Sequence, residues 1–115
     1  MRRSARVDEN QERVVAALRK IGCKVYVSSS FGQGFPDLIV GIPAANGERQ
    51  ILLVEVKDGS KPPSARKLTP DQVKFHAEWY GWPLFVVTSV DEALGLVQES
   101  RLSTKNGQLG NVDTH

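Results

Sequence analysis

The sequence predicts an α/β domain with a mixed sheet flanked by helices, in the order helix, three strands, helix, strand, helix (αβββαβα). Three observations carry this prediction. Apolar residues recur at helical spacing near the start of the chain, two strand-like apolar runs are joined by a turn dipeptide, and a well-capped helical segment precedes another apolar run. With 115 residues, 40% of them hydrophobic, the chain suits one domain with a modest core.

The first helix is predicted over residues 8–21, and Gly22 provides its stop. Its apolar residues recur at helical spacing: Val14, Val15, Leu18 and Ile21. Residues 23–29 then read as a strand. Cys23 is the one cysteine of the chain, which excludes an internal disulfide, and its apolar neighbours indicate a small core residue.

Two strands are predicted next, over residues 35–41 and 51–57, joined by a hairpin about the turn dipeptide Asn46-Gly47. The preceding loop, residues 30–35, contains two glycines that let the backbone approach a ligand, although ordinary turn chemistry explains them equally well.

The hairpin register gathers charged groups at one end of these strands. Antiparallel pairing places Asp37 opposite the stretch from Glu55 to Lys57, and Glu55 and Lys57 share a face because side chains alternate along a strand. Two carboxylates and an ammonium then converge, which can hold a divalent metal beside a cation. A solvated salt bridge is the alternative, and the crowding of charges at the end of apolar strands favours the metal site.

The second half of the chain begins with a polar, mobile loop at residues 60–67. A second helix over residues 70–80 follows, because Thr69 can cap it, Pro70 suits its first position and Gly81 ends it. Next come a strand at 83–88 and a third helix at 90–98. The single domain is therefore expected to span residues 1–98, with a flexible C-terminal tail at 99–115.

The net charge of +2 does not by itself indicate a nucleic-acid partner, but the distribution of charge along the chain is more informative. Arg2, Arg3 and Arg6 open the chain, and further basic residues follow the acidic strands, where a basic rim beside a metal site suits a phosphate-backbone substrate. The candidate nucleic-acid-binding residues are Ser30, Gly32, Lys61, Arg66, Lys67 and Lys74. For any single lysine, a solubilising role is as good an explanation.

The start of the chain lacks a secretory signal, because acidic residues and not an apolar segment follow its arginines. No apolar run is long enough to span a bilayer. We therefore expect an intracellular, soluble protein with no membrane partner.

Taken together, three runs resemble a known family. They are Gly34-Phe35-Pro36-Asp37-Leu38-Ile39-Val40, Val54-Glu55-Val56-Lys57, and Leu68-Thr69-Pro70-Asp71-Gln72 followed by His76 and Gly81. The chain is similar to PD-(D/E)xK nucleases, whose fold is restriction-endonuclease-like, and within them to the VRR-NUC group of small, often phage-encoded nucleases. We therefore expect a cytoplasmic protein, in a bacterial host if it is phage-encoded.

The resemblance implies roles for particular residues. Asp37 and Glu55 would bind the metal together with the backbone carbonyl of Val56, and Lys57 would orient or activate the attacking water. Gln72 matches a glutamine on the helix that faces the active site of the family.

The superfamily often adds an acidic ligand from the first helix. Here the family position falls on Gln11, and the adjacent Glu12 is our choice for that ligand. A solvated helix face explains Glu12 equally well.

The implied activity is phosphodiester hydrolysis in DNA by an endonuclease, leaving a 5′-phosphate and a 3′-hydroxyl. A hard cation held by oxygens suits this chemistry, so Mg²⁺ is the expected metal and Mn²⁺ should substitute. Nucleases of this resemblance commonly act as homodimers, and a two-fold axis would present two cuts to branched DNA such as a four-way (Holliday) junction or a flap.

Other readings stay open: a nicking or restriction-type enzyme, a noncatalytic DNA-binding subunit that kept the fold, and, more remotely, an interaction protein with no nucleic-acid role. The intact Asp37, Glu55 and Lys57 favour an enzyme. Four aromatic residues could stack on bases, but their helical spacing favours core or dimer packing. They are Phe75, Trp79, Tyr80 and Trp82. His76 is expected to be a packed or half-exposed residue.

Overall fold

The computed structural model describes residues 9–43 and 47–114, with side chains up to Leu102. The predicted element order is confirmed. The elements are α1 (Glu9–Lys20), β1 (Lys24–Val27), β2 (Leu38–Pro43), β3 (Arg49–Val56), the short 3₁₀ helix η2 (Pro63–Arg66), α2 (Pro70–Glu78), β4 (Leu84–Val87) and α3 (Val90–Thr114).

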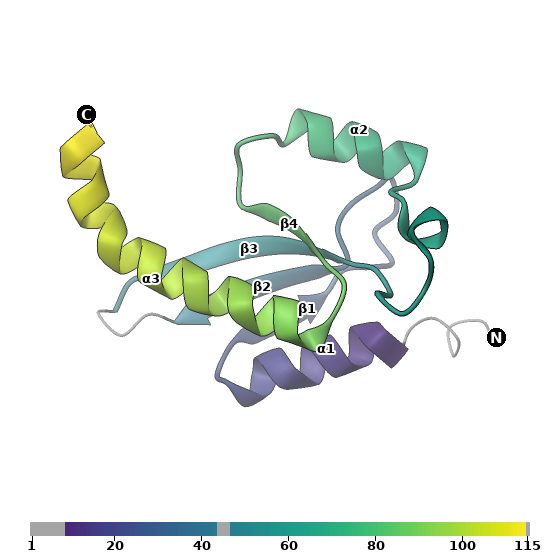
Figure 1. Ribbon diagram of the computed structural model, residues 1–115, viewed down its shortest axis with the longest axis horizontal. Coiled ribbons are helices and arrows are strands. Elements are labelled where there is room, and N and C mark those ends of the chain that lie inside the picture. Colours follow the sequence, from purple (N-terminus) through teal and green to yellow (C-terminus); the bar gives the residue numbers. More distant parts are fainter. Residues whose placement is uncertain (1–8, 44–46, 115) are drawn as a thin grey trace.

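The four strands form one mixed sheet in the order β1-β2-β3-β4. The first three strands are antiparallel to one another, whereas β4 runs parallel to β3 after the crossover that contains α2. Helices α1 and α3 lie side by side against one face of the sheet, and α2 lies on the opposite side, near the end of β3 (Figure 1). The sheet therefore has one covered face and one that α2 only partly covers.

The core lies between the sheet and the pair α1 and α3. It is built from alternate residues of β2 and β3 and from one stripe of α1, as the 2- and 3.6-residue periodicities dictate. Its buried members include Val14, Val15, Leu18, Cys23, Leu38, Val40, Ile42, Leu52, Val54, Val56, Val87, Ala93 and Val97. The core position predicted for Cys23 is confirmed, and burial raises the pKa of its thiol.

Two segments differ from their predictions. The loop at residues 60–67 contains η2, in which the Arg66 side chain donates a hydrogen bond from Nε to the carbonyl of Lys61 at 2.7 Å. The third helix does not end at residue 98 but continues to Thr114. Contacts with distant elements hold the start of this extension, since Gln50 donates to the Ser100 carbonyl at 3.0 Å and Arg101 to that of Ile21 at 3.5 Å.

Some predicted features lie outside the described residues, namely Asn46 of the turn and the three arginines Arg2, Arg3 and Arg6. In the part of the chain that is described, no helix has the length and apolar character needed to cross a bilayer.

Candidate active site

The paired strands bring Asp37 and Glu55 to the same face at one end of the sheet. Leu38 pairs with Val54, so Asp37, one residue earlier, stands beside Glu55. The Asp37 carboxylate also accepts a hydrogen bond at Oδ2 from the backbone N–H of Val56, at 2.9 Å. The predicted convergence of these two acids is therefore present in the folded chain.

Glu55 is the charged residue most deeply buried at this end of the sheet, with only 2% of its surface exposed. Its Oε2 accepts a hydrogen bond from Gln72 Nε2 at 2.8 Å and lies 3.4 Å from Lys57 Nζ. Its other oxygen, Oε1, is buried without a hydrogen-bond partner among the described residues. A buried acceptor left in this state is costly, so Oε1 marks a place where a ligand would be stabilising.

The two carboxyl groups disturb each other's ionisation. Burial, and then the neighbouring charge of Asp37, raise the pKa of Glu55 to about 7, against an opposing effect of Lys57. Burial also raises the pKa of Asp37, although the Val56 N–H bond and other contacts oppose it. Without a further positive charge, the pair therefore resists carrying two negative charges at neutral pH.

Helix α2 contributes Gln72, which connects the acids to Lys57. Its Oε1 accepts a hydrogen bond from Lys57 Nζ at 2.9 Å and another from the backbone N–H of Thr69 at 2.9 Å. Thr69 in turn caps the helix, because its hydroxyl accepts from the backbone N–H of Gln72. The predicted cap is confirmed, and the same glutamine completes both the capping box and the charged cluster.

The third predicted acid does not join the cluster. Glu12 is exposed in the first turn of α1, and the described residues contain no group of three His, Cys, Asp or Glu side chains that could hold a metal. The helix turns Asn10 toward the end of β3 instead, where its side chain donates to the carbonyls of Lys57 at 2.8 Å and Thr88 at 3.3 Å. Sequence reasoning missed Asn10, because nothing local marks its distant backbone partners.

The predicted nucleic-acid-binding residues lie on segments around the acids. Ser30 and Gly32 are exposed on the loop that leads from β1 to Asp37. On the other side of the acids, Lys61, Arg66 and Lys67 lie in and around η2, and Lys74 is exposed on α2. Their role in binding DNA stays a prediction.

Close packing joins the β1–β2 loop to α2. Gly34 has φ +81°, and a Cβ at this position would collide with the backbone of Asp71. A glycine is therefore required for the loop to lie against the first turn of the helix.

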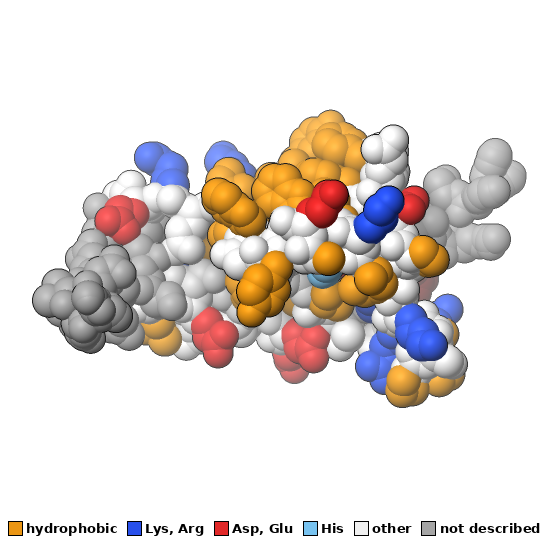
Figure 2. Space-filling model, turned by 90° about the horizontal axis from the view of Figure 1, so that it is seen from above, with side chains coloured by type: hydrophobic (Ala, Val, Ile, Leu, Met, Phe, Trp, Pro, Cys, Tyr) orange, Lys and Arg blue, Asp and Glu red, His pale blue; other side chains and the backbone are white. Residues whose placement is uncertain are grey.

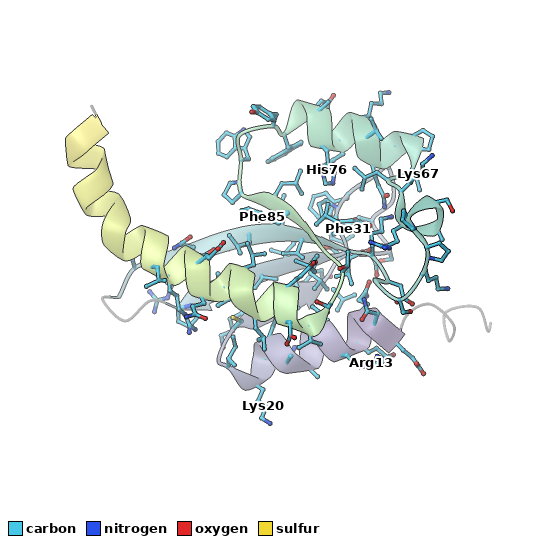
Figure 3. The ribbon with its side chains drawn as sticks, in the orientation of Figure 1. Arg13, Lys20, Phe31, Lys67, His76 and Phe85 are labelled. Atoms are coloured by element: carbon cyan, nitrogen blue, oxygen red, sulfur yellow. The ribbon has the colours of Figure 1, made fainter. Side chains whose placement is uncertain are left out.

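His76 points from α2 toward the sheet (Figure 3). It is half-buried, as expected, and its Nε2 is buried without a hydrogen-bond partner in the described part of the chain. Burial, together with the charge of Lys57, lowers its pKa and favours the neutral ring.

The aromatic residues of α2 and the loop after it are not core residues, which corrects one half of their prediction. Tyr80 is 90% exposed and Trp82 65% exposed. Ring contacts connect Phe75, Trp79 and Trp82 to the β1–β2 loop: Tyr26–Phe31, Phe31–Phe35, Phe35–Phe75, Phe75–Trp79 and Trp79–Trp82. Seen from the α2 side, hydrophobic side chains gather on this face, with Lys and Arg side chains at both ends (Figure 2). Dimer packing stays a prediction.

No protein-family model matches the chain, and neither does any curated protein. Among solved structures, the chain matches a VRR_NUC domain with 30% sequence identity and a TM-score of 0.55. The match covers 76% of this chain and 89% of the other. From this match, together with the order of helices and strands, we conclude that the chain belongs to the VRR-NUC family of PD-(D/E)xK nuclease domains.

Proposed function

We propose that this nuclease domain is a metal-dependent DNA endonuclease that hydrolyses phosphodiester bonds, with structure-selective action on branched DNA such as four-way junctions or flaps. The observation that carries the proposal is the pairing of Asp37 with the buried Glu55 beside Lys57, in a chain of the VRR-NUC family.

The donor set fits a hard divalent cation. The unpartnered Glu55 Oε1 and the raised pKa values of Glu55 and Asp37 are both consistent with a site that lacks one positive charge. Asp37, Glu55 and the backbone carbonyl of Val56 would hold Mg²⁺, and Mn²⁺ would substitute because it shares the preference for carboxylate oxygens. When bound, such a cation supplies a water of lowered pKa and charge stabilisation for the phosphate.

Lys57 has a separate task. Its ammonium is fixed between Gln72 Oε1 and Glu55 Oε2, at 2.9 and 3.4 Å, so its position is set before substrate arrives. From there it would place positive charge against the scissile phosphate and hydrogen-bond the attacking water. Gln72 would act as a positioning residue for both Lys57 and Glu55. The products would carry a 5′-phosphate and a 3′-hydroxyl.

Selectivity for branched DNA would come from a homodimer that presents two sites across a two-fold axis. The exposed aromatic side chains of the α2 side, such as Tyr80 and Trp82, are consistent with such an interface, since monomers rarely leave a large apolar patch exposed. Sedimentation of the purified protein measures the oligomeric state directly.

The test of catalysis uses labelled duplex, flap, splayed-arm and four-way-junction DNA, each with Mg²⁺, Mn²⁺ or EDTA. The wild-type chain should cut only with metal and should prefer the branched substrates. Asp37→Asn, Glu55→Gln and Lys57→Ala should each lose at least about 100-fold in cleavage rate. Cleavage that persists in EDTA, or in all three variants, would refute the mechanism.

Matched control variants distinguish a specific effect of the site residues from the general effect of removing a charge. Asp91→Asn, Glu99→Gln and Lys20→Ala make the same chemical changes at exposed positions of α3 and α1 and should cut as the wild type does. Metal binding has its own readout: Mn²⁺ should raise the melting temperature of the wild type and not that of Glu55→Gln. Branched DNA bound but never cut, with either metal, would instead favour a noncatalytic DNA-binding subunit.

A further inference from the structure

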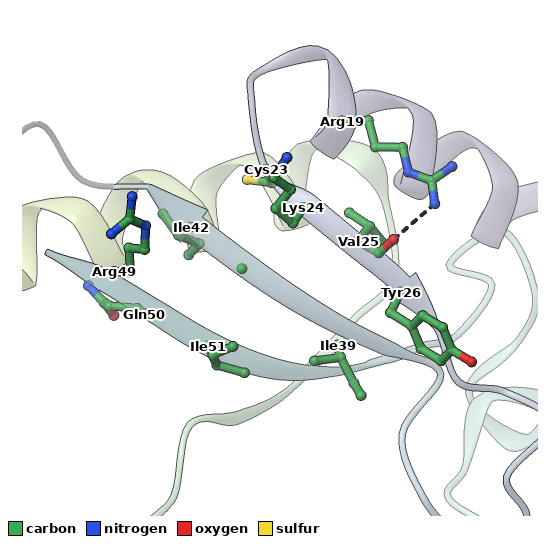
Figure 4. Close-up of a pocket in the computed structure, with 11 residues that line it drawn as sticks. Arg19, Cys23, Lys24, Val25, Tyr26, Ile39, Ile42, Arg49, Gln50 and Ile51 are labelled. Atoms are coloured by element: carbon green, nitrogen blue, oxygen red, sulfur yellow. Dashed lines mark hydrogen bonds between the residues drawn. The ribbon is translucent and has the colours of Figure 1, made fainter. Parts of the chain in front are cut away.

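A second feature lies on the same face of the sheet as Asp37 and Glu55, at the far ends of the strands. It is a cavity of about 610 Å³, called here the sheet-face groove, whose lining includes Lys24, Tyr26, Ile39, Gly41, Arg49 and Ile51 (Figure 4). Gly41 contributes no side chain at the centre of the strand surface, which helps to keep the groove open. Neither α1 nor α3 covers this face (Figure 1).

The chemistry of the groove suits an anion that also has apolar parts. Three of its described lining residues are cations, Arg19, Lys24 and Arg49, and none is acidic. Arg19 donates to the carbonyl of Val25 at 2.9 Å, whereas Lys24 and Arg49 are exposed and appear in none of the ion pairs found in the described residues. The sugar–phosphate backbone of DNA combines an anionic phosphate with an apolar deoxyribose face.

The strand register aligns the groove with the acids. Ile51 pairs with Gly41, which pairs with Lys24, and all three lie on the face that carries Glu55, because residues two apart share a face. At about 3.3 Å per strand residue, Ile51 lies about 13 Å from Glu55 along β3 and Arg49 about 20 Å. Since DNA rises about 3.4 Å per base pair, these distances correspond to about four base pairs at the level of Ile51 and Lys24 and to about six at Arg49.

We propose that the sheet-face groove is a second DNA contact, in which Lys24 and Arg49 hold the backbone of a DNA arm about four to six base pairs from the phosphodiester bond that is cut. The inference rests on the proposed function, because it takes the DNA at the acids as its starting point. It adds a binding site remote from the motif residues and fixes the side toward which one arm of the substrate extends.

The first experiment measures binding in EDTA, so that no cleavage occurs. The dissociation constant for a labelled duplex is determined by fluorescence anisotropy between 50 and 300 mM salt. The double variant Lys24→Ala/Arg49→Ala should reduce the slope of log K against log salt by about 2, because each lost phosphate contact reduces it by about 1. The control Lys20→Ala removes a cation whose side chain points away from the sheet (Figure 3), and it should leave the slope unchanged.

A second variant tests the groove by shape and leaves all charges in place. In Gly41→Val the new Cβ would lie 3.5 Å from the Cβ of Lys24, an ordinary contact, and a β-branched residue suits a strand. The variant should therefore fold, which its circular dichroism and melting temperature verify. Its side chain should partly fill the groove and weaken DNA binding several-fold.

A third measurement locates the arm. Duplex arms are lengthened one base pair at a time on each side of the cut, and cleavage is followed under subsaturating conditions. Cleavage by the wild type should become markedly faster as one arm grows to about four to six base pairs, and cleavage by Lys24→Ala/Arg49→Ala should not. An unchanged salt slope in that variant would overturn the proposal. So would a change in sedimentation of Gly41→Val with DNA affinity intact, because the groove would then be a subunit interface.

The two proposals fail in different ways. If the groove variants lower the salt slope but the wild type never cuts DNA with Mg²⁺ or Mn²⁺, the proposed catalysis is refuted and the groove remains a DNA contact. If cleavage depends on metal but the groove variants have no effect, the proposed catalysis is supported and the proposed DNA contact in the groove is refuted. If the wild-type chain binds no DNA, both proposals are refuted.

Discussion

Gln72 Oε1 accepts a hydrogen bond from Lys57 Nζ at 2.9 Å, which ties the cation after β3 to the first turn of α2. The other end of the same side chain donates to Glu55 at 2.8 Å. One neutral amide therefore fixes both partners of a close ion pair. An amide suits this position, because it offers an acceptor to the ammonium and a donor to the carboxylate at once.

Replacing Gln72 with alanine should reduce kcat about 10–100-fold with little change in KM, the usual cost of losing a residue that orients a metal ligand, the role proposed here for Glu55. The change also removes half of the capping box, so a control is needed. Thr69→Ala weakens the cap by about 1 kcal/mol but keeps the Gln72 side chain. If Thr69→Ala slows cleavage as much as Gln72→Ala does, helix capping and not side-chain positioning explains the effect.

Glu55 should make the stability of the metal-free protein depend on pH. Its pKa is raised to about 7 in the folded chain from an ordinary value of 4.5, so the folded state favours the protonated form. The resulting contribution of Glu55 to the free energy of unfolding is fully present below about pH 4.5 and is lost as the pH rises through about 7. The melting temperature should therefore fall over that window in EDTA.

The neutral variant Glu55→Gln isolates this effect. It should match the wild type near pH 4.5 and be the more stable protein above pH 7, and Mn²⁺ should reduce the difference by stabilising the ionised wild type. If the melting temperatures of the two proteins changed equally with pH between pH 4 and 8, the pKa of Glu55 would not be raised in the folded chain.

Gly34 should tolerate substitution much less than its neighbour Gly32. Both have positive φ, +81° and +78°, so alanine is strained at either position. A Cβ at Gly34 would also collide with the backbone of Asp71, whereas nothing lies within 4 Å of one at Gly32. Urea unfolding should find Gly34→Ala about 1–3 kcal/mol less stable than Gly32→Ala, the range of an overpacking penalty. Equal losses would mean that backbone strain alone matters.

Asn10→Ala should destabilise the fold by about 1–3 kcal/mol, because the partly buried carbonyls of Lys57 and Thr88 lose their side-chain donor. Arg13→Ala, one turn later on α1, breaks only an exposed ion pair with Glu9 and should cost less than about 0.5 kcal/mol. Chemical denaturation of both variants measures the contrast. A loss of similar size in each would assign the effect to α1 helicity.

The order of elements could be predicted because each element carries its own local signal, such as the Thr69 cap or the helical spacing of Val14 and Leu18. The meeting of Asp37 with Glu55 was also predictable, since a hairpin and the alternation of side chains determine it. The continuation of α3 was not, because its composition is poor in helix formers and contacts with the distant residues Gln50 and Ile21 hold its start.

The remaining parts of the site depend on tertiary packing. Which residue of α1 faces the end of β3 is decided by how that helix lies on the sheet, and the structure places Asn10 there while Glu12 is exposed. The sheet-face groove could not be predicted from the sequence for a similar reason. A strand glycine such as Gly41 gives no sign, on its own, of whether a helix will cover it.

The shared role of Gln72 has a consequence for the temperature dependence of the proposed cleavage. Helix α2 has only nine residues, and none of them is buried, so the helix as a whole should open locally before the four strands separate. Such opening would withdraw the amide from Lys57 and Glu55 together. Cleavage should therefore fade during warming while the sheet is still intact, and the local stability of this short helix, measurable by amide hydrogen exchange, should set the upper working temperature.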